Sequence, residues 1–351
     1  MKIKKNNKQT YTDEECKKII QYFMELKGDI IREFLRSKNI AISGPKPELR
    51  KRIEESLDEG DLHYEDLVNL LDSIAPYGKQ HIFLYDGPDN EVEKWRDKKY
   101  VEDQLRKERL LKLLKSPLPL ILPNNLSISS IQYEPSRVLK IYAVERRENY
   151  ERIHEYDEIK LIEGKEIELR AYIHQVTRGV MIFIWDLISN NATLQISQLP
   201  TGSKYEEEEI KFAELINSWL NLNSFTKLDL RRVIKKLHEL EANGIPEARS
   251  HGLSYLSQGG RRITAQSPTP QDSIFGEQEV DIALKSIRDR GVGNIGNFYW
   301  LPKSINSANG NPLEREVHTI IVGNKSRINF TTPNKKEDIE YVLSRVRILS
   351  R

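Results

Sequence analysis

The hydrophobic pattern of the chain changes its period once, and this change constrains the fold more than any other feature. Up to about residue 115, apolar residues recur with the spacing of one helical face. After Pro117, Pro119 and Pro123, short stretches alternate between apolar and polar residues, as half-buried strands do. We therefore place a boundary at 116–130 and predict an α+β protein, because hairpins followed by helices do not build a parallel sheet.

The N-terminal part is predicted to be helical. Apolar spacing indicates helices at 13–26, 29–37, 47–57 and 64–74. Thr12 and Glu15 have the spacing of a capping box at the start of the first helix. A short strand at 81–85 is followed by a long charged helix over 90–115. These segments give two N-terminal regions, 1–60 and 61–115.

The C-terminal part, 130–351, is predicted to hold an antiparallel sheet and helices. It has two weakly similar halves in which strands precede helices, 130–243 and 252–351. Strands are expected at 138–144, 167–175, 180–186, 192–198, 297–301, 316–322 and 326–331, and helices at 206–222, 228–243, 277–289 and 335–348. Thr177-Arg178-Gly179 is predicted to be a hairpin turn, 244–275 a loop, and 158–165 a charged connector.

Charge is distributed unevenly along the chain. The 55 Lys and Arg and 53 Asp and Glu give a formal net charge of +2, which excludes a uniformly basic nucleic-acid coat. Residues 1–52 nevertheless contain 14 basic and 7 acidic residues, and acidic runs such as Glu206–Glu209 offset this excess. A basic end suggests an anionic partner there, although Lys2–Lys8 alone fits a solubilising tail.

Compartment is predicted from cysteine content and from apolar runs. The single cysteine, Cys16, excludes an intramolecular disulfide framework and a zinc site built from cysteines. The longest apolar runs, Pro117–Pro123 and Val180–Ile188, are far shorter than the ~20 residues of a membrane span. We expect no membrane partner and a cytoplasmic protein, associated with the nucleoid if the source is prokaryotic.

The segment Ile31–Ile53 reads IREFLRSKNIAISGPKPELRKRI and predicts two short helices joined by an extended loop. It resembles a SAP domain, near residues 29–57, which is a helix–extended loop–helix module. The resemblance covers under a tenth of the chain, and its motif stands here as Ser43, Gly44, Lys46, Leu49, Arg52 and Ile53. Two positions depart from the pattern. Asn39 replaces a glycine but tolerates the left-handed conformation, and Pro45 replaces a basic residue.

The resemblance implies binding to the phosphate backbone of duplex DNA. A helix N-terminus has free N–H groups and a positive dipole end, which is a natural site for a phosphate. The residues expected to contact DNA are Arg36, Lys38, Ser43, Gly44, Lys46, Arg50 and Lys51. The role of Arg52 stays open between a phosphate contact and packing over the loop.

A second basic loop is Gly259-Gly260-Arg261-Arg262. Its glycines permit close approach of the backbone, and Arg261 and Arg262 supply forked donors for phosphate. We consider it a secondary nucleic-acid contact or, alternatively, a solvated hairpin turn.

Catalytic patterns are weak. Gly291, Gly293 and Gly296 form a literal G-x-G-x-x-G, but a helix precedes it and a strand follows, which reverses the dinucleotide-binding order and favours a turn. Glu158, Glu163 and Asp186 lie near lysines or strand ends, as in metal-dependent nucleases, but such spacings arise by chance in a sequence rich in Glu and Lys. No two of the seven histidines are three or four positions apart, so no metal or cofactor is expected.

The sequence thus favours a DNA-binding protein rather than an enzyme. The larger domain would be a second interface for DNA or for protein, with protein partners or a homo-oligomer allowed. Two alternatives remain, a metal-dependent nuclease targeted by the SAP-like module, and an adaptor subunit of a DNA-maintenance or defence complex.

Overall fold

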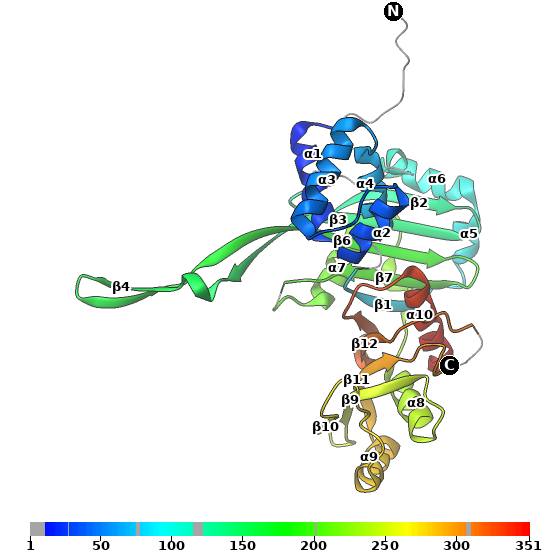
Figure 1. Cartoon of the computed structure of the whole chain (residues 1–351). Coiled ribbons are helices and arrows are strands. Elements are labelled where there is room, and N and C mark those ends of the chain that lie inside the picture. Colours follow the sequence, from blue (N-terminus) through cyan, green and yellow to red (C-terminus); the bar gives the residue numbers. More distant parts are fainter. Residues whose placement is uncertain (1–10, 27, 75–77, 115–121, 201, 307–309) are drawn as a thin grey trace, which may run out of the picture. The chain divides into compact units, whose positions relative to one another are not determined.

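The computed structural model describes residues 11–26, 28–74, 78–114, 122–200, 202–306 and 310–351 (Figure 1). These residues fall into two compact units, one within 1–76 with Leu122, and one within 77–116 and 123–351. The lysine-rich stretch at 2–8 and residues 116–121 of the expected boundary lie outside the described ranges. Within those ranges, no helix has the length and apolar character needed to cross a membrane.

The first unit consists of helices. Their bounds are α1 Asp13–Glu25, α2 Gly28–Ser37, α3 Lys46–Glu59 and α4 Tyr64–Ile74, so all four predicted helices are confirmed. Thr12 and Glu15 form the predicted capping box, with the Glu15 N–H donating to the Thr12 hydroxyl at 3.3 Å. One small core holds the helices together, with Ile19, Phe23, Ile31, Leu35, Leu49, Ile53 and Leu67 fully buried.

The second unit is built on an 11-stranded antiparallel sheet, which confirms the α+β class. The strand order is β10-β9-β11-β12-β13-β1-β7-β6-β3-β2, and the short β8 also pairs with β1. The strands are β1 Gln80–Asp86, β2 Ser127–Glu134, β3 Val138–Arg152, β6 Tyr172–Asp186, β7 Asn191–Ser197, β8 Thr226–Lys227, β9 Ala248–Leu256, β10 Arg262–Gln266, β11 Val292–Trp300, β12 Val317–Val322 and β13 Arg327–Phe330. A separate two-stranded sheet joins β4 Glu158–Ile162 to β5 Lys165–Leu169.

Helices cover the sheet. They are α5 Val92–Arg96, α6 Lys98–Lys107, α7 Tyr205–Ile216, α8 Arg231–Ala242, α9 Gln278–Arg290 and α10 Lys336–Ser350. Short 3-10 turns lie at Leu111–Leu113, His154–Tyr156, Leu222–Ser224 and Gly323–Lys325. The last four α-helices agree with the prediction to within a few residues, except that α7 ends at Ile216 rather than at 222.

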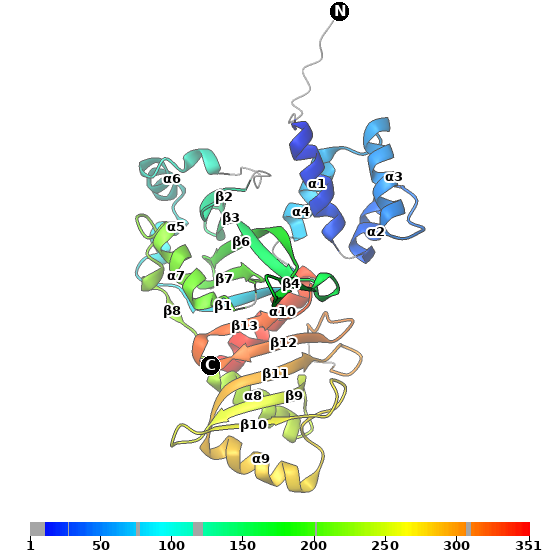
Figure 2. The same ribbon diagram turned by 90° about the vertical axis from the view of Figure 1, so that its left-hand side faces the viewer.

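The strand β1 joins two halves of the sheet that bury opposite faces. It pairs with β7 on one side and β13 on the other (Figure 2). Successive side chains of a strand point to opposite faces. Phe83 and Tyr85 therefore enter a core with α5, α6 and α7, whereas Ile82 and Leu84 enter a second core with α8 and α10. The helical cover changes sides at β1.

The long helix predicted over 90–115 is wrong. Two short helices, α5 and α6, stand there, separated at Asp97. The Asp97 side chain accepts a hydrogen bond from the Lys99 N–H at 2.9 Å and caps α6. Such a cap competes with continuation of the helix, and periodicity alone did not show it.

The turn predicted at Thr177-Arg178-Gly179 is also wrong, because β6 runs through it without a break. Gly179 pairs with Glu145, and a Cβ there would lie 2.4 Å from Nε of Arg147. This glycine therefore lets the Arg147 side chain lie directly against the backbone of β6. The real turn lies at Glu163 and Gly164, which both have positive φ, so the expected connector at 158–165 is a hairpin.

The loop predicted over 244–275 contains β9 and β10. The β9–β11 pairing has two register shifts, one of them opposite Ser250 and Gly252. Such irregularities break the apolar alternation from which a strand is recognised.

The G-x-G-x-x-G stretch forms strand β11 rather than a turn from Val292 onward. A Cβ on Gly293 would lie 2.9 Å from the Arg231 carbonyl oxygen, and one on Gly296 would lie 3.3 Å from Cγ2 of Ile234. The Gly293 contact is with α8, so this glycine lets the helix pack directly on the strand, whereas the nearest atom to a Cβ on Gly296 is Cε2 of Phe298 in β11 itself.

We expect Gly293→Ala to destabilise the second unit by about 1–3 kcal/mol, because the added methyl group overpacks the contact with α8. Chemical denaturation of the full chain measures this loss. Gly259→Ala is the matched control, since the nearest atom to a Cβ there is 4.0 Å away. Equal stability of the two variants would contradict the role assigned to Gly293.

Acid is expected to weaken the second unit through His238. Burial, with Arg288 as the second cause, lowers the pKa of His238 to about 3. Below about pH 6.5 the unfolded chain binds a proton that the native histidine does not, so stability falls by up to about 1.4 kcal/mol per pH unit. This loss continues as pH falls toward the folded-state pKa.

His238→Gln is neutral at every pH and is expected to flatten this slope. Urea unfolding at a series of pH values measures the slope separately from the absolute stability. A variant whose stability falls with acid as steeply as that of the parent would rule out this role of His238.

Candidate nucleic-acid interface

The loop between α2 and α3 begins with a left-handed residue. Asn39 has a φ of 59°, and the Ile40 N–H donates to the Leu35 carbonyl at 2.9 Å. This six-to-one hydrogen bond is the Schellman ending of a helix, in which glycine or asparagine takes the left-handed position. Asn39 therefore adopts the left-handed conformation that the sequence allowed for it, and Gly44 takes a second positive φ of 94°.

Two arginines hold the loop from opposite helices. Arg32 of α2 donates to the Gly44 carbonyl at 3.1 Å. Arg52 of α3 donates to the carbonyls of Ala41 and Ser43 and, at 3.2 Å, to the Ser43 hydroxyl. Arg52 therefore acts as a packing side chain over the loop, which answers the question that its sequence left open.

The remaining predicted contacts flank this loop, and most are already paired within the unit. Lys38 forms an ion pair with Asp66 at 2.7 Å, and the Lys46 ammonium donates to the Met24 carbonyl at 3.0 Å. The other paired cations are Arg50, with Glu54 at 2.9 Å, and Lys51, with Glu55 at 3.6 Å. Exposed pairs of this kind contribute only about 0–1 kcal/mol, so an anion can replace the acid.

Arg36 differs from these side chains. It is exposed in the last turn of α2, and its guanidinium has no ion pair among the described residues. It is therefore the predicted contact that needs no rearrangement to bind a phosphate.

Charges along α3 run against the helix dipole. Its N-terminal half holds Lys46, Arg50, Lys51 and Arg52, and its C-terminal half holds Glu54, Glu55, Asp58 and Glu59. The dipole favours acids at a helix N-terminus and cations at a C-terminus, so both halves have the unfavourable sign. Sequences that break a local rule in this way often do so at functional sites.

One acid departs from this arrangement. Glu48 is in the first turn of α3, and its carboxylate lies so close to Gly44 that a Cβ there would be 2.1 Å from Oε2. This carboxylate occupies the region where a phosphate at the helix N-terminus would lie. Binding an anion there requires Glu48 to rotate away.

The basic excess is confined to residues 1–52 of the sequence. Residues 53–76 contain 8 acidic residues and no Lys or Arg, so residues 1–76 carry 14 basic against 15 acidic residues. The basic excess of residues 1–52 is thus cancelled along the chain by the acids that follow Ile53.

Arg261 and Arg262 lie at a hairpin turn of the second unit, as the alternative interpretation predicted. The turn joins β9 to β10, Gly260 has a φ of 76°, and both arginines are exposed. The backbone N–H of Arg261 donates to the Ser257 hydroxyl at 3.1 Å. The Arg261 guanidinium has no ion pair in the described chain.

The residues considered for a nuclease are not brought together. Asp186 ends β6 and accepts hydrogen bonds from the Ile188 N–H and the Ser189 hydroxyl, so it caps a turn. Glu158 begins β4, which lies at the far end of the β3–β6 ribbon from Asp186 (Figure 1), and it pairs with Lys160 at 2.9 Å. The described residues contain no group of three or more His, Cys, Asp or Glu placed to hold a metal ion.

A polar aromatic cluster on the sheet was not predicted. The rings of Tyr299 and His318 stack at 4.3 Å, and the Arg249 guanidinium lies 5.1 Å from the Tyr299 ring. His318 is also hydrogen-bonded to Asn297 at 2.6 Å, and Arg249 pairs with Glu316. The alternation of residues in β11 and β12 indicates which side chains share this face of the sheet. The third strand, β9, lies in the segment that the sequence predicts to be a loop.

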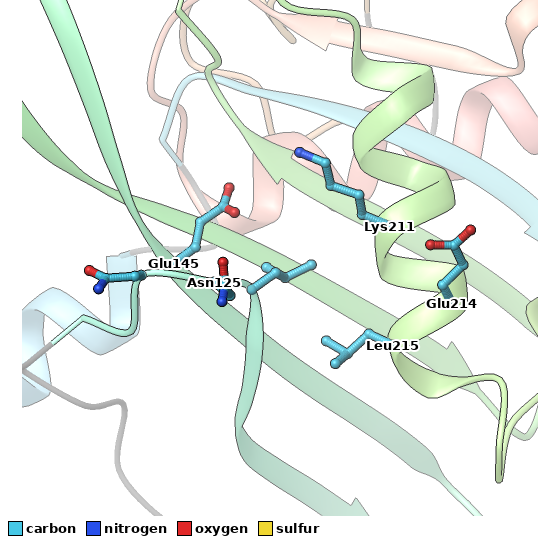
Figure 3. A pocket seen from close by; sticks show the side chains of 7 residues that line it. Asn125, Glu145, Lys211, Glu214 and Leu215 are labelled. Carbon is cyan, nitrogen blue, oxygen red and sulfur yellow. The ribbon is translucent and has the colours of Figure 1, made fainter.

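A shallow pocket of about 540 Å³ opens beside α7 (Figure 3). Its charged lining consists of Glu145, Lys211 and Glu214, and Lys211 is paired with Glu208 at 2.5 Å. That pair raises the pKa of Lys211. Because Glu208 holds the Lys211 ammonium, the described lining offers no free cation, and none of the predicted contacts lines the pocket.

Comparison with known proteins gave no match to any family model and none to any curated protein sequence.

Arg52→Lys is expected to destabilise the loop by about 1–3 kcal/mol, because lysine cannot reproduce the forked contacts with Ala41 and Ser43. Hydrogen exchange of the amides at 39–44 in the full chain measures this local effect. The neighbouring Lys51→Ala is the control and should change stability by less than about 0.5 kcal/mol. Unchanged exchange in the Arg52 variant would show that the arginine does not hold the loop.

Proposed function

We propose that this chain is a DNA-binding protein whose N-terminal unit contacts the phosphate backbone of duplex DNA in the manner of a SAP domain. The observation that carries the proposal is the inverted charge order of α3. Four cations lie in the first two turns of α3, next to a helix N-terminus whose dipole end is already positive. This combination is unfavourable for the isolated helix and favourable for binding an anion.

The proposed contact exchanges weak internal pairs for phosphates. Arg36 binds directly, whereas Arg50 and Lys51 leave Glu54 and Glu55 when the duplex approaches. Ser43 and Gly44 offer backbone and hydroxyl donors once Glu48 has rotated away. Such contacts fix the position of a duplex without reading its bases, so weak sequence preference is expected.

The second unit supplies a further interface in this proposal. The exposed Arg261 and Arg262 can add phosphate contacts, and linkage of two modest binding surfaces in one chain raises overall affinity through effective concentration. The protein would act in the cytoplasm, on the nucleoid if its source is prokaryotic.

Reversing two charges tests the proposal. The double variant Lys46→Glu plus Arg50→Glu should weaken binding to a duplex of arbitrary sequence by more than about tenfold at low salt. Each lost phosphate contact lowers the dependence of log affinity on log salt concentration by about 0.9. Fluorescence anisotropy across a salt series measures both quantities.

The matched control is Lys94→Glu plus Lys99→Glu, which makes the same change in net charge on α5 and α6. Both lysines are exposed, and neither is ion-paired in the described chain. Circular dichroism checks that the helices of both variants persist. If the two double variants bind duplex DNA with the same affinity and salt slope, α3 is not a DNA-contacting element.

A further inference from the structure

A two-stranded ribbon extends beyond the sheet of the second unit. β2 pairs with β3 only as far as Val144, and β7 pairs with β6 only from Met181 onward. Beyond these points β3 and β6 pair only with each other, and β4 and β5 form the tip of the ribbon (Figure 1). We name residues 145–179 the arm.

The arm is anchored at its root. The Arg147 guanidinium is buried and donates to Glu145 at 2.6 Å and to the Ser197 hydroxyl at 2.9 Å. Glu208 of α7 lies 3.8 Å from the same guanidinium. The start of the arm is therefore fixed to β7 and α7.

The tip is fixed to the ribbon. Asp157 accepts a hydrogen bond from the Ala171 N–H at 3.0 Å and forms an ion pair with Arg152 at 2.7 Å. The Ile153 N–H donates to the Ala171 carbonyl at 3.0 Å. The arm is thus a defined structure along its length rather than a loose loop.

Large apolar side chains are concentrated on the arm. Half of the 18 exposed large hydrophobic residues in the described chain lie there, namely Tyr150, Tyr156, Ile159, Leu161, Ile162, Ile167, Leu169, Tyr172 and Ile173. Ile159 and Leu161 are 74% and 73% exposed. Contiguous exposed apolar residues mark interaction sites, and an isolated two-stranded hairpin is at best marginally stable in water. The arm therefore needs a covering partner.

The charge of the outer part of the arm disfavours an anionic occupant. Residues 148–173 contain 8 Asp and Glu and 4 Lys and Arg, a net charge of −4. DNA and anionic membrane surfaces attract cationic segments, so this part of the arm repels both. Its occupant is a protein.

Both faces of the tip carry aliphatic side chains, and their free charges are opposite. Residues opposite each other in antiparallel strands share a face. One face, which we name the lysine face, therefore holds Glu158, Lys160, Ile162, Lys165, Ile167 and Leu169. The other face, which we name the glutamate face, holds Ile159, Leu161, Glu166 and Glu168.

One charge on each face is unpaired. On the lysine face Lys160 is neutralised by Glu158 at 2.9 Å, and on the glutamate face Glu168 is neutralised by Arg170 at 3.1 Å. Lys165 and Glu166 have no ion pair among the described residues and project to opposite faces. Each face is therefore aliphatic with one free charge, and the two signs are complementary.

We propose that the arm is a self-association element whose occupant is the arm of a second copy of this chain. The lysine face of one tip packs on the glutamate face of the next, which buries both aliphatic rows and pairs Lys165 with Glu166 across the contact. Such a contact joins different patches of two copies, so it is heterologous and builds rings or open chains rather than a closed dimer. The contact is small, so association depends on concentration.

Sedimentation velocity of the full chain without DNA tests the proposal across a wide concentration range. The parent protein is expected to pass from monomer to species larger than a dimer. Ile159→Ser plus Leu161→Ser should weaken this association by more than about tenfold, because two aliphatic side chains are lost from the contact. The control Ile188→Ser plus Ile245→Ser removes equally exposed residues outside the arm and should leave association unchanged.

A charge swap identifies the two faces. Lys165→Glu alone and Glu166→Lys alone should each weaken association by about twofold to fivefold, because like charges then meet across the contact. The double variant K165E/E166K restores opposite signs between neighbouring copies and should recover the parent affinity.

Three outcomes overturn the proposal. One is a chain that stays monomeric at all concentrations. Another is association that the arm variants do not weaken, or that K165E/E166K does not restore. The third is hydrogen exchange in the arm that slows only when duplex DNA is added, which makes DNA the occupant. Only the hydrogen-exchange experiment uses DNA. Failure of the self-association proposal is therefore separable from failure of the proposed DNA binding.

Discussion

Strand β1 is the constraint on which the second unit depends. It is separated by about forty residues from the next strand in the chain, yet it pairs with β7, β8 and β13 and is buried on both faces. Phe83 and Tyr85 belong to one core, and Ile82 and Leu84 belong to the other. Without β1, the two halves would each expose a long unpaired strand edge, which invites aggregation.

The acidic run at the start of α7 is a second organising contact. Glu206, Glu208 and Glu209 are at most one-third exposed, and side chains from strands and from the turn before β13 hold them in place. The partners are Lys325 and Arg327 for Glu206, Arg147 for Glu208, and Tyr85 and Lys227 for Glu209. The sequence suggested that this run merely offsets the basic N-terminal end. It is instead an ion-pair network that docks α7 across strands from both halves and fixes the root of the arm.

The two proposed interfaces use opposite electrostatics. The loop end of the first unit gathers cations against the preference of the α3 dipole, whereas residues 148–173 of the arm carry a net charge of −4. A DNA-contacting surface and a self-association surface of opposite sign do not compete for the same ligand. Association of several copies would also place several DNA-contacting units together, and multivalency of this kind raises affinity without any new contact to DNA.

The helices of the first unit could be predicted from the sequence, because they depend on local spacing and caps, whereas the break between α5 and α6 could not. Thr12 with Glu15, Asn39 before the loop and the apolar faces of α2 and α3 needed only neighbouring residues. The α+β class followed from the change in hydrophobic period. Four predicted DNA contacts also proved to be internally paired. The Arg50–Glu54 and Lys51–Glu55 pairs have the i,i+4 spacing that a sequence shows, whereas Asp66 and Met24 are brought to Lys38 and Lys46 only by packing.

Tertiary structure decided where the strands begin and which residues share a face. The sequence predicts turns at Gly179 and Gly293. In the structure, however, Gly179 lies against the Arg147 side chain and Gly293 lies against α8. A glycine required by a close approach is indistinguishable in sequence from a glycine required by a turn, since both follow from the missing Cβ. The arm could not be recognised from the sequence either. Its apolar residues alternate like those of any half-buried strand, and only the ends of β2 and β7 show that no third strand covers them.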